Sequence, residues 1–110
     1  MAAAIAVKCQ RAAAVDATAA RQVCREFIDY LRETLPSQTF DAGTDTVPRL
    51  DVTVVRANAR GIGFELSWIG TDGSARPGLP LSTTFYDRES GETLRRQFFK
   101  ALLEQNPIPF

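Results

Sequence analysis

The stretch that decides the fold is LDVTVVRANARGIGFELSW, from Leu50 to Trp68. Apolar and polar residues alternate at both of its ends, which is the period-two pattern of a half-buried strand. The middle, residues 58–61, contains Asn and Gly, which favour a tight turn. The stretch therefore predicts a β-hairpin with one apolar face, made of Leu50, Val52, Val54, Ile62, Phe64, Leu66 and Trp68.

Two amphipathic helices are expected, one on each side of this hairpin in the sequence. The first is predicted to begin at Asp16 or Thr18 and to end before Pro36, because its apolar residues recur at steps of three and four. The second is predicted from Ser90 to Asn106, where the same spacing returns and a proline follows. Each helix has an apolar stripe that needs a sheet to cover.

A third strand is predicted at Leu81–Phe85, where the alternation returns. The predicted fold class is α+β, an α-β-β-β-α two-layer sandwich. Its three strands form an antiparallel meander, and both helices lie on one face. The other face, which carries Asp51, Glu65 and Tyr86 among other polar residues, is expected to face water.

The length of 110 residues fits one domain. Hydrophobic residues make up 45% and charged residues 24%, which is typical of a globular protein with its own core. Residues 1–15 are Ala-rich without a clear period, so they are expected to form a flexible arm. Residues 16–106 are expected to form the single α+β domain, and residues 107–110 an extended C-terminal tail.

Charge is balanced along the chain, because thirteen Lys and Arg residues offset thirteen Asp and Glu residues. A nucleic-acid binder normally has a basic face, so no nucleic-acid partner is expected. No apolar run approaches the roughly 20 residues that span a bilayer, so no membrane insertion is expected. Two compartments stay open. The apolar residues 1–7 suit either a cytosolic N-terminus or the mature start of a periplasmic or otherwise exported chain whose signal peptide was removed.

Histidine is absent, which removes the commonest general base and the commonest metal ligand. Asp51 and Glu65 can face each other across the hairpin, and a carboxylate pair of this kind would suit a small enzyme with acid–base chemistry. A solvated sheet surface explains the same two residues more simply. We therefore expect no enzyme, no catalytic residues and no cofactor. Two thiols are too few for a structural zinc site, and no metal site is expected.

Cys9 and Cys24 have two interpretations. In a reducing cytosol Cys24 is a small core residue of the first helix and Cys9 is a free thiol. In an oxidising compartment the two form a disulfide. If the helix begins near Asp16, Cys24 lies about 12 Å along its axis. The segment from Cys9 to Asp16 can span about 23 Å when extended, so the arm can reach back over the helix.

The helix–strand–strand–strand–helix order is also that of double-stranded-RNA-binding domains, which hold phosphates with a lysine cluster at the start of the second helix. Here Arg95, Arg96 and Lys100 lie near Glu89 and Glu92, so the local charge is neutral. RNA binding is therefore an alternative that rests on topology only.

The predicted function is a non-enzymatic protein–protein binding or assembly module whose partner the sequence does not identify. Three surfaces are candidates for the contact: an exposed sheet edge, the polar sheet face around Tyr86, and the tail with Ile108 and Phe110. A short sheet always has two edges, and edges pair readily. Homodimerisation through one edge is therefore expected.

Overall fold

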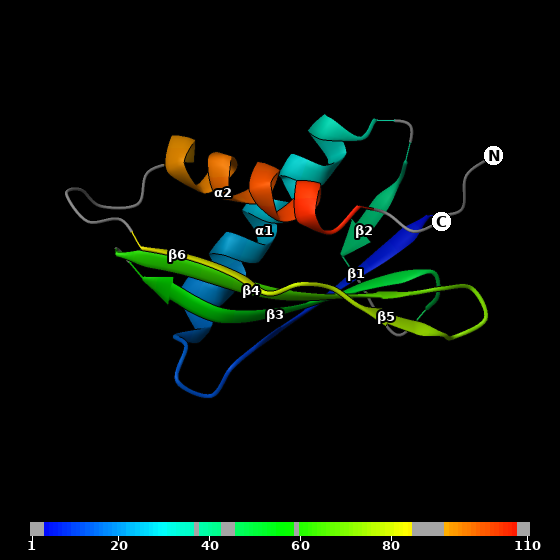
Figure 1. Ribbon diagram of the computed structural model, residues 1–110, viewed down its shortest axis with the longest axis horizontal. Coiled ribbons are helices and arrows are strands. Elements are labelled where there is room, and N and C mark those ends of the chain that lie inside the picture. Colours follow the sequence, from blue (N-terminus) through cyan, green and yellow to red (C-terminus); the bar gives the residue numbers. More distant parts are fainter. Residues whose placement is uncertain (1–3, 37, 43–45, 59, 85–91, 108–110) are drawn as a thin grey trace.

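The computed structural model describes residues 4–36, 38–42, 46–58, 60–84 and 92–107. These residues form two helices and six strands (Figure 1). In order they are β1 (Ile5–Arg11), α1 (Ala17–Thr34), β2 (Phe40–Ala42), β3 (Arg49–Asn58), β4 (Gly61–Ile69), β5 (Ala75–Pro77), β6 (Leu81–Thr84) and α2 (Glu92–Gln105).

The predicted hairpin is β3 and β4, which pair antiparallel as expected. Leu50 lies opposite Trp68, and Val52 lies opposite Leu66. These four side chains are at most 3% exposed, because they point from the sheet into the core. β6 pairs antiparallel with β4, so the three expected strands are adjacent.

The sheet is larger than the predicted three-stranded meander. Five of its six described strands run in the order β2-β1-β3-β4-β5, and the sixth, β6, pairs with β4. The fold is α+β as predicted, but the sheet is mixed, because β1 pairs in parallel with both β2 and β3. β2 lies between the first predicted helix and the predicted hairpin, and β5 lies between that hairpin and the third predicted strand, where no strand was expected.

The segment that was expected to be a flexible arm contains β1, and this prediction is wrong for Ile5–Arg11. Ile5 and Val7 are each 2% exposed and belong to the core. Ala6 between them is buried too, and the last three residues of β1 are exposed, so the strand lacks the alternation that predicts a half-buried strand. α1 carries the chain from β1 back to the start of β2, and such a crossover makes the two strands parallel.

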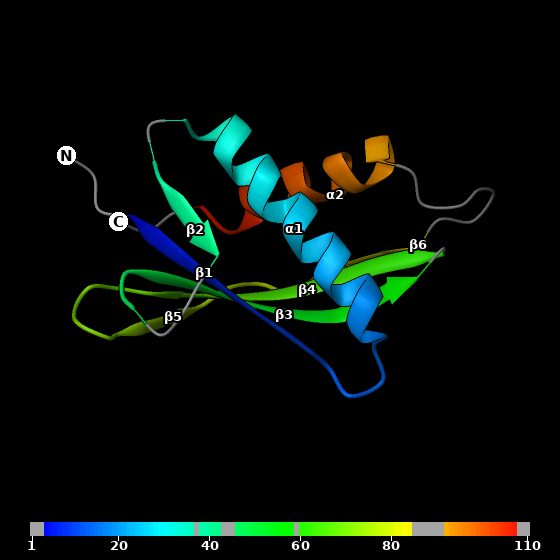
Figure 2. The ribbon, with the colours of Figure 1, turned by 180° about the vertical axis from the view of Figure 1, so that it is seen from behind.

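Both helices lie on the same face of the sheet, as predicted (Figure 1 and Figure 2). α1 begins at the predicted cap, because Asp16 accepts a hydrogen bond from the Ala19 backbone N–H at 2.9 Å. The helices meet the sheet in an aromatic cluster, in which the Phe27 ring lies 5.3 Å from Phe64 and 5.2 Å from Phe99. Such edge-to-face and tilted contacts add to the burial of apolar area that stabilises the core.

Candidate interaction surfaces

Short strands form both edges of the sheet. β2 lies at one edge, and β5 and β6 both lie beyond β4 at the other. Asp41 is exposed on β2, and Arg76 is exposed on β5. An edge strand has backbone N–H and C=O groups directed away from the sheet, which pair readily with another chain. The two edges therefore offer backbone groups together with side chains of opposite charge.

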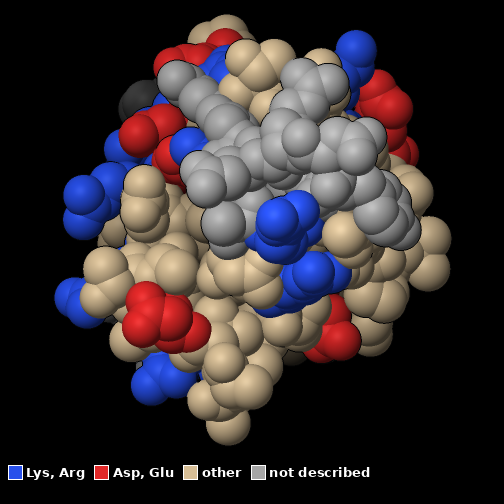
Figure 3. Space-filling model, turned by 90° about the vertical axis from the view of Figure 1, so that its left-hand side faces the viewer, with Lys and Arg blue, Asp and Glu red and all other residues tan. Residues whose placement is uncertain are grey.

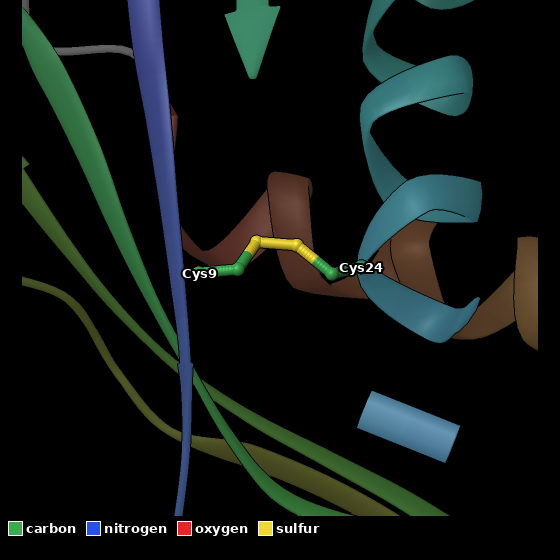
Figure 4. The surroundings of a disulfide bond; sticks show 2 residues. All are labelled: Cys9 and Cys24. Atoms are coloured by element: carbon green, nitrogen blue, oxygen red, sulfur yellow. A yellow bond between two sulfur atoms is a disulfide. The ribbon is translucent and has the colours of Figure 1, made fainter. Parts of the chain in front are cut away.

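Cys9 and Cys24 are joined by a disulfide that connects β1 to α1 (Figure 4). Their Cα atoms are 6.5 Å apart, within the range that such bonds require. Cys24 is 5% exposed and lies in the apolar stripe of α1. The bond that the sequence permitted in an oxidising compartment thus holds a strand of the sheet, instead of a flexible arm, against the helix.

A groove of about 530 Å³ lies between α1 and β1, beside this disulfide. Its floor is mainly apolar and includes Ala20 and Ile28. The charged residues of the described ranges that line it are four arginines and one aspartate: Arg11, Arg21, Arg25, Arg32 and Asp29. The groove is therefore apolar in its depth and positively charged at its rim, although the whole chain has no net charge.

The outer sheet face is polar, as the alternation predicted. Glu65 is exposed there, and Asp51 is bound to Arg49, whose Nε lies 2.6 Å from the carboxylate. Asp51 lies opposite Ser67 and Glu65 opposite Thr53, so the two acids are on neighbouring strands and two residues out of register. This arrangement gives Asp51 a structural partner and does not bring the two carboxylates together as an acid–base pair.

The basic residues of α2 contact carboxylates of α1. Arg95 donates from Nε and Nη2 to both carboxylate oxygens of Glu26, at 2.5 and 2.8 Å. Arg96 donates to Glu33 at 2.7 Å. These ion pairs join the two helices above the sheet. Arg95 and Arg96, which occupy the place of the phosphate-binding lysines in RNA-binding domains, are thus held in ion pairs within this domain.

Basic and acidic side chains are also mixed on the face shown in Figure 3, and neither sign forms a continuous field there. Among the titratable groups of the described chain, the pKa of Asp72 is lowered. Hydrogen bonds from the backbone and side chain of Ser74 to the Asp72 carboxylate cause this shift, and Asp72 is fully exposed in the turn before β5. The shift therefore reflects turn chemistry.

The three residues proposed as a partner surface lie outside the described residues: Tyr86, Ile108 and Phe110. Within the described ranges, no group of three His, Cys, Asp or Glu side chains is placed to hold a metal ion. Neither described helix is both long enough and apolar enough to cross a membrane. The groove at α1 was missed by the sequence analysis, because it depends on β1 lying beside α1.

No family model matches this sequence, and no curated protein matches it. Solved structures share its fold. They include PelC from Paraburkholderia phytofirmans, a dodecamer seen in two crystal forms, one of them of a point variant. The chain superposes on PelC with TM-scores of 0.75 and 0.74 at 12% identity, over 99% of this chain and 89% and 90% of PelC.

A crystal structure of an uncharacterised protein also has this fold, with a TM-score of 0.53 at 13% identity over 89% of this chain and 83% of that one. At such low identities the likeness shows the fold alone. The chain is thus an α+β domain of the architecture that PelC has, with two helices on a mixed sheet of six strands.

Proposed function

We propose that this domain is a non-enzymatic assembly module that associates with copies of itself. The observation that carries the proposal is the likeness to PelC, which spans 99% of this chain and belongs to a protein seen as a dodecamer. A match over nearly the whole of both chains leaves little additional structure in PelC to which its assembly could be attributed. The shared domain is therefore the natural candidate for the assembling unit.

The two edges of the sheet support an assembly of this kind. Contact between unlike surfaces of successive copies is heterologous, and such contacts close into a ring when the rotation between copies permits it. β2 and β5 are unlike edges, with Asp41 exposed on one and Arg76 on the other. Pairing of β2 in one copy with the β5 edge in the next joins backbone groups and opposite charges at once.

A binding role suits the polar residues better than a catalytic one. Asp51 is committed to Arg49, and Arg95 and Arg96 are committed to Glu26 and Glu33. These ion pairs hold the charged side chains within the domain, which supports a structural role for them. We also expect no binding of RNA, and a mobility shift that stays negative at low salt is the corresponding result, since phosphate contacts are strongest there.

The disulfide supports a place in an oxidising compartment. Disulfides persist in the periplasm and outside cells, and they are rare in a reducing cytosol. The Cys9–Cys24 bond connects two elements of the core layer, so its loss would loosen the sheet against α1. We propose that the domain works in such a compartment, with the bond intact.

The test of self-assembly is the mass of the oxidised protein in solution, measured by native mass spectrometry and by light scattering after gel filtration. The monomer has a mass of 12.1 kDa. We expect a defined multiple of this mass that persists as the protein is diluted through the micromolar range. A single species at the monomer mass at every concentration would show that the domain does not assemble by itself.

A further inference from the structure

The edge of β1 is only partly covered by β2. The pairing between them ends at Val7 and Ala42, whereas β1 continues to Arg11. No other described strand lies against Cys9–Arg11 on that side. The second half of β1 is thus paired with β3 alone among the described strands.

The direction of the backbone groups follows from the bonds at the two ends of β1. The N–H groups of Ala6 and Ala12 donate toward β3, to Pro48 and Val54, at 3.1 and 2.9 Å. Alternate residues of a strand direct their backbone groups to opposite sides. Cys9 and Arg11 therefore direct their N–H and C=O groups away from β3, toward the groove beside α1.

The charges around this groove are unequal. Arg11 donates to the Val15 carbonyl at 2.9 Å and Arg32 donates to the Phe40 carbonyl at 3.0 Å. Arg32 also lies 3.8 Å from the Asp29 carboxylate, which offsets its charge in part. Arg21 and Arg25 are exposed on α1 and make no ion pair with any other described residue. Asp29 is the one acidic side chain among the described residues that line the groove.

We infer that this groove binds an acidic peptide segment in extended conformation, which adds to β1 as a strand and places its carboxylates among the arginines of α1. Three features fit the same occupant. The β1 backbone supplies hydrogen bonds to a strand, the apolar floor receives alternate side chains, and the arginine rim attracts negative charge. This inference does not depend on self-assembly, because the segment can belong to a different protein.

The experiment uses the oxidised full chain and a fluorescent peptide of about six residues, the usual length of a strand, in which Glu and Val alternate. Fluorescence anisotropy should show saturable binding that weakens as salt is added. The same peptide with Lys in place of Glu should not bind. Equal binding of both peptides, or binding of neither, would overturn the inference.

Variants locate the site. R21E/R25E should bind the acidic peptide about tenfold more weakly or worse, because two favourable charge pairs become repulsive. R60E/K100E is the control, since it makes the same change of charge at exposed residues that do not line the groove. It should bind like the wild type. Equal loss in both double variants would mean that overall charge, and not the groove, attracts the peptide.

A second peptide separates strand addition from mere attraction of charge. N-methylation at alternate residues removes the backbone donors that face β1 but keeps every carboxylate, so binding should be lost. Persistent binding would show that no strand is added.

A short single-stranded oligonucleotide that binds equally well would also contradict the proposal. A third result would contradict it as well: the wild type binds no peptide, and R21E/R25E loses the oligomer. The groove would then be a contact between copies of the chain.

Discussion

At the scale of single residues, Asn106 shows how a polar side chain can hold distant segments together. It is the one polar residue that is buried in the described part of the chain. Its Oδ1 accepts from the Leu79 N–H at 2.6 Å, and its Nδ2 donates to the carbonyls of Leu79 and Leu102 at 3.1 and 3.0 Å. Because each polar group has a partner, its burial stabilises the fold.

Gly78 is explained by the same contact. A Cβ atom at this position would collide with the side-chain oxygen of Asn106 and would lie 3.1 Å from the Leu66 carbonyl oxygen. Gly78 also donates its N–H to that carbonyl at 2.7 Å. The chain between β5 and β6 therefore passes close to the end of α2, and only a residue without a side chain fits there.

We predict that Asn106→Ala lowers the free energy of unfolding by about 1–3 kcal/mol, because it leaves the N–H and C=O of Leu79 without their partner. Urea denaturation of the oxidised protein measures this change. Gln105→Ala is the control, since Gln105 is its exposed neighbour in α2, and its effect should stay within about 0.5 kcal/mol. Equal stability of the two variants would show that water replaces Asn106 at no cost.

At the scale of elements, the disulfide connects β1 to α1 at the edge where β1 is least covered. Ile5 and Val7 hold the first half of β1 in the core, and β2 covers that half. Cys9 lies in the second half, beyond the last residue paired with β2. The bond to Cys24 therefore anchors the part of the strand that has fewer neighbouring strands among the described residues.

We predict that C9A/C24A loses about 3 kcal/mol of stability, the chain-entropy value for a loop of this length. Urea denaturation with and without reductant measures it. The wild type should fall to the stability of the variant when reduced, and the variant should not respond to reductant. Alkylation of the unreduced protein from its own host, followed by mass measurement, should add no label. Labelling of both thiols would contradict the oxidised state.

The elements that the sequence predicted are those in which apolar residues recur with a clear period. The helix after Asp16 has a cap and a full apolar stripe. The hairpin of β3 and β4 alternates over residues 50–54 and 62–68, and its register shifts between Val54 and Arg56. β2 and β5 have three residues each, too few for a period to be visible. β1 was missed because its first three residues are all buried and its last three are exposed, so the strand has no alternation that a period-two pattern could reveal.

The candidate surfaces could be predicted only in part. The polar sheet face followed from the alternation in β3 and β4. The groove required two facts that no local pattern contains, namely that β1 belongs to the sheet and that α1 crosses beside its uncovered half. The arginines at its rim are spread along the sequence from Arg11 to Arg32, in a chain with no net charge. The sequence therefore shows no basic cluster that would mark the groove.

At the scale of the whole molecule, the order of the strands sets which surfaces can meet in an assembly. β2 and β5 are the two ends of the strand order, and they belong to opposite edges of the sheet. The structure describes no strand beyond either edge, so each edge can contact a neighbour. On β2 the Phe40 carbonyl already accepts a hydrogen bond from Arg32 Nε. Asp41 and Arg76 then lie on the two surfaces that a heterologous contact would bring together.

We predict that Arg76→Glu weakens the assembly, because an acidic residue on the β5 edge would then face Asp41 on the β2 edge of the next copy. Like charges at such a contact destabilise it. Asp41→Arg alone should weaken it equally, whereas D41R/R76E should restore it, since the swap recreates opposite charges. Native mass spectrometry over a dilution series gives the oligomer fraction. Failure of the double variant to recover, with both single variants impaired, would place these residues in different contacts and rule out the β2–β5 pairing.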